Sequence, residues 1–172
     1  MMVWPAPVTR LALAGAALGL VAGCAREDEA GMRARLAQWF ALGETVAFAA
    51  RGDCAAGVFR LRGDAIGAAL PVARSVAGML RTLDRRGRAA LDDRAQPPDA
   101  ALVEIANADR ATGTAMRRAA LEARECMDAD TRAGFHAGLT AQGAMLAHDR
   151  ESGTVMVIDR DAGRIFALMG AR

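Results

Sequence analysis

The sequence predicts an α+β fold in which two β-hairpins, four strands in all, form one antiparallel sheet packed against several helices. Two observations indicate the hairpins: β-compatible segments flank turn residues within 44–61 and again within 154–169. A third indicates the helices, because apolar residues recur at helical spacing over most of residues 64–149. Strand order does not follow from these patterns.

Residues 1–23 have the composition of an export signal that is cleaved from the mature protein. Arg10 is the one charged residue before a wholly apolar run at residues 11–22. That run is shorter than the roughly 20 apolar residues that a membrane-spanning helix needs, and a charged cluster follows it at once. We therefore expect a signal peptide at 1–23 and a single α+β domain at 24–172.

The apolar run ends in the sequence Val-Ala-Gly-Cys at residues 21–24. This stretch resembles the lipobox of bacterial lipoproteins, with Val21 where leucine is usual. The resemblance covers only the first two dozen residues. It implies that Cys24 is thioether-linked to diacylglycerol, becomes the first residue after cleavage, and is then N-acylated with a fatty acid such as palmitate. The alternative is an ordinary secretory signal with an incidental cysteine.

A lipid on Cys24 would fix both the location of the domain and one of its partners. Two or three acyl chains hold a soluble domain stably on a bilayer, whereas one chain holds it only marginally. In the class that the motif resembles, an aspartate after the cysteine is associated with inner-membrane retention. This chain has Ala25 there, which favours the outer membrane. We expect a periplasm-facing domain anchored in the cell envelope.

An amphipathic helix is expected directly after the anchor, over residues 26–41, with Gly43 as its stop signal. Its spacing predicts packing against the core, and contact with lipid headgroups is the alternative for its aromatic residues. No long Gly/Ser or Pro-rich tether separates this helix from Cys24, so the domain should lie close to the membrane. The apolar stripe consists of Met32, Leu36, Trp39 and Phe40.

The two hairpins frame the domain. Strands at 44–51 and 54–61 surround a Gly-Asp turn, and strands at 154–158 and 164–169 are joined through residues 159–163. Both strands of the second hairpin are apolar at nearly every position, so both faces should be covered. Helices cover one face. A helix of the same chain is favoured for the other, and a dimer or partner surface is the alternative.

Three helical stretches are predicted between the hairpins, from Asp64 to residue 83 with a kink at Pro71, from 99 to 128, and from 131 to 149. The last carries His136 and His148. Twelve residues at about 100° each place them roughly 120° apart around the axis, so they do not form the adjacent-turn pair of a helical metal site. The sequence indicates no metal site and no cofactor.

The densest basic cluster falls at the end of the first of these stretches. Such a run is usually a solvated helix face, and the alternative is a patch that binds anionic lipid headgroups, polysaccharide or an acidic partner protein. The mature chain is close to neutral overall and no aromatic residues interleave with the cluster, so nucleic acid is not an expected partner. The cluster consists of Arg74, Arg81, Arg85, Arg86 and Arg88.

With Cys24 assigned to lipid, Cys54 and Cys126 remain as an even pair in a compartment that permits disulfides. A Cys54–Cys126 disulfide is therefore predicted. One alternative is a pair of unbonded buried thiols. The other is a Cys54 nucleophile with His136 or His148 as its base, although no local sequence signature supports it.

The expected function is that of a membrane-anchored envelope lipoprotein of unknown molecular activity, acting as a binding or structural/interaction module, with a non-enzymatic role favoured over an enzymatic one. Its expected partners are the bilayer, through acylated Cys24, and an envelope protein or anionic lipid. The competing hypothesis is a small envelope hydrolase or thiol enzyme that uses Cys54 with a histidine base. The sequence indicates no particular ligand or substrate.

Overall fold

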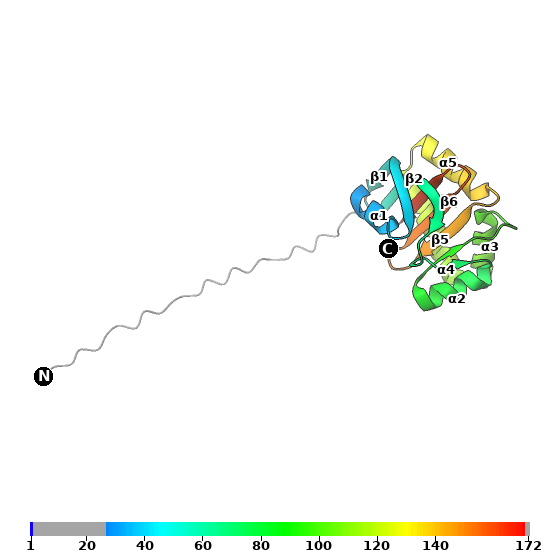
Figure 1. Ribbon diagram of the computed structural model, residues 1–172, viewed down its shortest axis with the longest axis horizontal. Coiled ribbons are helices and arrows are strands. Elements are labelled where there is room, and N and C mark those ends of the chain that lie inside the picture. Colours follow the sequence, from blue (N-terminus) through cyan, green and yellow to red (C-terminus); the bar gives the residue numbers. More distant parts are fainter. Residues whose placement is uncertain (2–26, 171–172) are drawn as a thin grey trace.

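The computed structural model describes residues 27–170 together with Met1, so the predicted signal segment and Cys24 lie outside the described residues. The described chain contains one seven-stranded sheet with the order β1-β2-β7-β6-β5-β4-β3 (Figure 1). All neighbouring strands are antiparallel except β3 and β4. The strands are β1 (Phe40–Arg51), β2 (Cys54–Ile66), β3 (Val72–Ala73), β4 (Arg88–Leu91), β5 (Met145–Asp149), β6 (Thr154–Asp159) and β7 (Arg164–Met169).

The predicted four-stranded antiparallel sheet is wrong, although the fold is α+β. The two predicted hairpins are β1–β2 and β6–β7, and they lie side by side because β2 pairs with β7. The sheet then continues through β5, β4 and β3, which makes it mixed. The missed strands β4 and β5 each contain only three apolar residues in a row, and runs this short fit a helical and an extended period equally well.

Five α-helices and one 3₁₀ turn complete the described chain. The helices are shorter than predicted because local signals divide the long periodic stretches. Asp109 accepts a hydrogen bond from the backbone N–H of Thr112 and so begins a new helix at Arg110, in the middle of the predicted 99–128 helix. The helices are α1 (Glu29–Leu36), α2 (Val76–Arg86), α3 (Pro98–Ala108), α4 (Arg110–Ala123) and α5 (Ala129–Thr140), with η1 at Arg124–Cys126.

The start of α2 also differs from the prediction. Strand β2 extends to Ile66, where a helix led by Asp64 was expected. Ser75 caps α2 instead, accepting a hydrogen bond from the backbone N–H of Gly78. Pro71 lies in the connection before the cap, where its missing N–H interrupts no helix.

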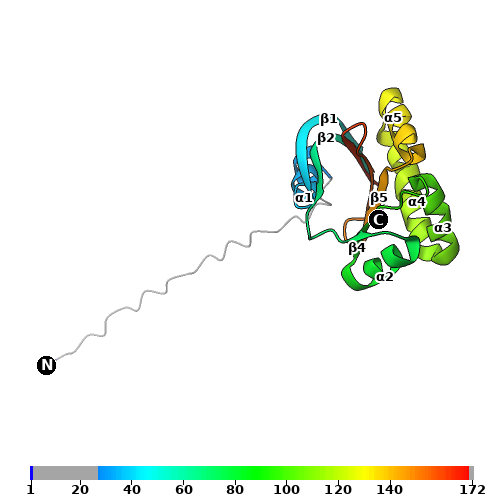
Figure 2. The same ribbon diagram turned by 45° about the vertical axis from the view of Figure 1, so that its right-hand side comes forward.

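Both faces of the sheet are covered, as the apolar terminal hairpin predicts. Figure 2 shows α2 to α5 on one side of the sheet and α1 on the other, beneath the curved β1–β2 pair. Neighbouring residues of β6 point into different cores: Val157 packs with the layer of four helices, whereas Met156 and Ile158 pack with α1. The predicted cover from the same chain is confirmed, because α1 supplies it with Met32 and Leu36.

The predicted disulfide is confirmed. Cys54 at the start of β2 is bonded to Cys126 in η1, with 6.1 Å between the two Cα atoms. The bond therefore ties the sheet to the end of the helix layer. The sulfur of Cys54 is bonded in this structure, so no thiol is present there to act as a nucleophile.

The contact between α3 and α4 provides a stability test at Gly113. A Cβ atom there would lie 2.6 Å from the Cβ of Ala106 and 2.8 Å from its backbone nitrogen. We predict that Gly113→Ala lowers the free energy of unfolding by about 1–3 kcal/mol through overpacking, although alanine is the better helix former. Urea denaturation of the parent and the variant measures this difference in the free energy of unfolding.

The matched control is Gly63→Ala on β2, where an added Cβ has no atom within 4 Å. This variant should stay within about 0.5 kcal/mol of the parent. Equal stability of the two variants would contradict the close helix contact.

Candidate functional site

A polar hollow with a volume of about 340 Å³ opens on the α1 face of the sheet. Its lining residues come from three separate parts of the chain. They are brought together because α1 and the turn after it lie against the ends of β4 and β5. The lining consists of Arg35, Gln38, Trp39, Arg88, Asp149, Glu151 and Ser152.

The register of β4 against β5 brings a basic and an acidic side chain of the polar hollow together. Arg88 is directly opposite Asp149 in the antiparallel β4–β5 pair. The Arg88 guanidinium also lies 5.6 Å from the centre of the Trp39 ring, a cation–π contact, and 3.1 Å from the carboxylate of Glu151. Arg88 is thus held between a buried indole and two carboxylates.

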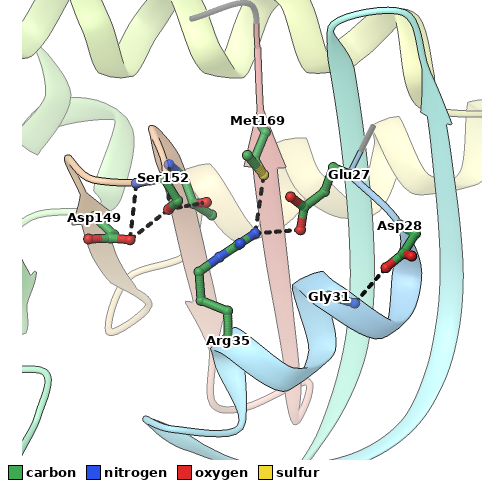
Figure 3. A network of polar contacts seen from close by, with 8 residues as sticks. Glu27, Asp28, Gly31, Arg35, Asp149, Ser152 and Met169 are labelled. Carbon is green, nitrogen blue, oxygen red and sulfur yellow. Dashed lines mark hydrogen bonds and ion pairs between the residues drawn. The ribbon is translucent and has the colours of Figure 1, made fainter. Parts of the chain in front are cut away.

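Asp149 belongs to a buried network that closes the β5–β6 turn (Figure 3). Its Oδ2 atom accepts a hydrogen bond of 2.6 Å from the Ser152 hydroxyl, which lies 2.7 Å from the hydroxyl of Thr154. The other oxygen, Oδ1, has no hydrogen-bond partner and lies 3.8 Å from Arg88 Nε. Only 3% of the Asp149 side chain is exposed, so this oxygen is an unsatisfied buried acceptor.

Two donors of the polar hollow are also unsatisfied. Arg35 uses Nη2 to bond Glu27 at 2.6 Å and to approach the sulfur of Met169 at 3.3 Å, but its Nε–H has no partner (Figure 3). The indole N–H of Trp39, a residue only 2% exposed, has none either. Of the four buried side-chain polar atoms without a partner in the described chain, three therefore belong to residues that line this one hollow.

Unsatisfied buried groups indicate which chemistry the polar hollow accommodates. Leaving such a group unbonded costs about 1–3 kcal/mol, so a concentration of them calls for an explanation. Two donors and one acceptor match a ligand that offers hydrogen-bond acceptors and a donor. Because the carboxylates of Glu27, Asp149 and Glu151 already lie beside the two guanidiniums, the polar hollow has no excess positive charge to attract an anion.

The structure separates the predicted arginine cluster into three environments. Arg74 pairs with the buried carboxylate of Asp92 at 2.6 Å, and Arg88 lines the polar hollow from β4. The other three, on α2, are exposed and make no ion pair within residues 27–170. These are Arg81, Arg85 and Arg86.

The two histidines are also apart. His136 is exposed on α5, whereas His148 is buried on β5 and not on a helix as predicted. His148 Nδ1 lies 3.1 Å from the carbonyl oxygen of Thr154, and since a carbonyl only accepts, Nδ1 carries the proton of the neutral ring. Neither imidazole lines the polar hollow.

Comparisons with protein-family models, with curated proteins and with solved structures find no match to this chain. Among the described residues, no group of three or more His, Cys, Asp or Glu side chains is arranged to hold a metal ion. No helix formed by those residues has the length and apolar character needed to cross a bilayer. The site is therefore interpreted from its own geometry.

The buried imidazole of His148, next to Asp149 on β5, provides a test of burial in this part of the sheet. Burial lowers the pKa of His148 below its ordinary value of 6.5, and nearby Arg150 acts in the same direction. The unfolded chain thus binds a proton near pH 6.5, while the folded chain binds it only at lower pH. We predict that the free energy of unfolding falls as the pH drops below about 6.5 and that His148→Gln weakens this dependence.

Chemical denaturation between about pH 7 and pH 5 measures the effect. The control is His136→Gln, which replaces an exposed histidine on α5 and should leave the slope unchanged. If the His148 variant kept the full slope, the buried imidazole would not be its origin.

Proposed function

We propose that this chain is a lipid-anchored cell-envelope lipoprotein whose domain binds a small, neutral polar ligand in the polar hollow. The observation that carries the binding proposal is the concentration of unsatisfied buried atoms on Arg35, Trp39 and Asp149. These atoms have almost no exposed surface, so a ligand with hydroxyl or amide groups would supply the two acceptors and the donor that they lack only after the side chains lining the polar hollow shift to admit it.

The lipid anchor is supported by the motif that ends at Cys24. Two residues lie between Cys24 and Glu27, and the three residue steps from one to the other span at most about 11 Å of extended chain. Glu27 pairs with Arg35, which lines the polar hollow. A bilayer that holds acyl chains on Cys24 would therefore lie near this hollow, and we infer that the domain samples ligands close to the membrane surface.

Binding rather than catalysis is proposed because the described residues that line the polar hollow include no activated nucleophile. Ser152 is the hydroxyl residue among its lining side chains, and its oxygen is hydrogen-bonded to Asp149 and close to the Thr154 hydroxyl. A nucleophilic serine needs an adjacent base that is itself free to take the proton, commonly an imidazole. His148 bonds the backbone of Thr154 instead.

The anchor is tested by Cys24→Ala. We predict that this variant leaves the membrane fraction and incorporates no radiolabelled palmitate, since the substitution removes the sulfur that carries the diacylglycerol. Cys54→Ala is the control, because it alters a different cysteine and should retain the label. If the Cys24 variant kept both the label and the membrane association, the lipoprotein proposal would be withdrawn.

The binding proposal is tested with Trp39→Phe, which removes the indole N–H but keeps an aromatic ring. We expect neutral monosaccharides, N-acetylated sugars or primary amides to raise the melting temperature of the full chain. Trp39→Phe should weaken the binding of the active compound about tenfold, through loss of one buried hydrogen bond. Because Trp39 is buried in the core, the smaller ring should also lower the melting temperature of the free protein, so binding is compared as the shift that the compound produces in each variant.

Arg85→Gln on α2 is the control, because Arg85 is exposed and lies outside the polar hollow. It should bind as the parent does. If no compound of these classes shifts the parent, or if Trp39→Phe responds like the parent, the polar hollow is not the binding site.

A further inference from the structure

A second hollow lies in the helix layer, on the opposite side of the sheet from α1. This apolar groove runs between α3, α4 and α5 and has a volume of about 290 Å³. Its apolar lining comes from all three helices. These residues are Leu102, Ala120, Leu121, Phe135 and Leu139.

The charged side chains around the apolar groove are all cationic. They are Arg117 of α4, Arg124 of η1 and Arg132 of α5. The imidazole of His136, also on α5, lines the groove as well. No carboxylate is among the described residues that line the groove. Arg132 donates to the backbone carbonyl of Asp128 at 3.4 Å, and within the described chain none of the three guanidiniums forms an ion pair with an acidic side chain.

This arrangement differs from the nearby surface of α4. Arg118 lies on the same helix but is paired with Glu122 at 2.7 Å. Leu121, in contrast, is 59% exposed at the groove although it is apolar. Exposed apolar surface bordered by guanidiniums without a direct ion pair is complementary to a ligand with an apolar body and an anionic end.

The size of the apolar groove selects among such ligands. A partner helix has a diameter of about 10–12 Å with its side chains, whereas about 300 Å³ is the lower limit of ordinary small-molecule pockets. The volume of about 290 Å³ therefore fits a single alkyl chain better than a helix or a two-chain lipid. The acyl chains on Cys24 are a poor fit as occupants because of where they start. They would begin within about 11 Å of Glu27, and Glu27 pairs with Arg35 on the opposite side of the sheet from the apolar groove.

We propose that the apolar groove binds a free single-chain fatty acid. Its alkyl chain lies among Leu102, Leu121 and Phe135, and its carboxylate pairs with Arg117 and Arg124. The guanidinium forks of arginine suit a carboxylate, and the apolar lining replaces water around the chain. This site is separate from the polar hollow and does not depend on the function proposed for it.

The proposal is tested by photolabelling the full chain in lipid nanodiscs with a palmitic acid that carries a diazirine on its alkyl chain. Peptide mapping should place the label on α4 and α5. We expect the double variant Arg117→Glu/Arg124→Glu to reduce labelling about tenfold or more, because it removes two charge-assisted interactions and adds repulsion.

The double variant Arg81→Glu/Arg85→Glu is the matched control. It makes the same change in net charge on exposed residues of α2, outside the apolar groove, and should label like the parent. Circular dichroism melting of both variants shows whether each one is folded. A third variant, Ala120→Trp, fills the groove without a change in charge and should also abolish labelling.

Two further probes test whether the groove prefers an anionic head group and whether the bound alkyl chain belongs to a free fatty acid or to a phospholipid. A diazirine alkylammonium of equal length should label the groove poorly, as should a diazirine phosphatidylglycerol. Equal labelling by the ammonium would overturn the charge argument, and equal labelling by the phospholipid would overturn the single-chain ligand. Labelling that is unchanged by Arg117→Glu/Arg124→Glu or by Ala120→Trp would place the fatty acid elsewhere.

Discussion

The need to cover both faces of β6 and β7 determines the arrangement of the rest of the chain. Residues on alternate sides of these strands are buried, so the sheet is stable only between two layers. The layer of α2 to α5 covers one face. The single helix α1 covers the other, and it places Arg35 and Trp39 over the ends of β4 and β5. Both hollows are thus products of this double cover: one lies beside α1 and the other between the helices.

The hairpins were predictable because they depend on local signals, such as the turn at Gly52-Asp53 and the apolar strands before and after Gly163. The disulfide was predictable by elimination. Strands β4 and β5 were not, since each contains only three consecutive apolar residues, and so short a run carries no period that separates strand from helix. Their state is decided by pairing with distant strands, which a single sequence does not display.

The polar hollow was not predictable for a related reason. Arg88 was grouped with its neighbours in a basic cluster. However, Gly87 has a left-handed backbone conformation and ends α2, so that Arg88 is the first residue of strand β4. From there Arg88 meets Asp149, 61 residues later, only because β4 and β5 pair in one particular register. The Asp149-to-Ser152 turn, which is followed by the left-handed Gly153, is the local feature that could have indicated it. The lipidation of Cys24 remains a prediction, whereas the burial of Trp39 is confirmed.

The disulfide also determines how the protein responds to proteolysis. Cys54 and Cys126 are 72 positions apart, and the segment between them contains α2, β4, α3 and α4. A single cut in an exposed connection of that segment, such as Arg94-Ala95, produces two peptides that remain one covalent molecule. The nicked chain keeps the mass of the intact protein, apart from one added water, until it is reduced. Under non-reducing conditions, an apparently intact band therefore does not exclude cleavage between the two cysteines.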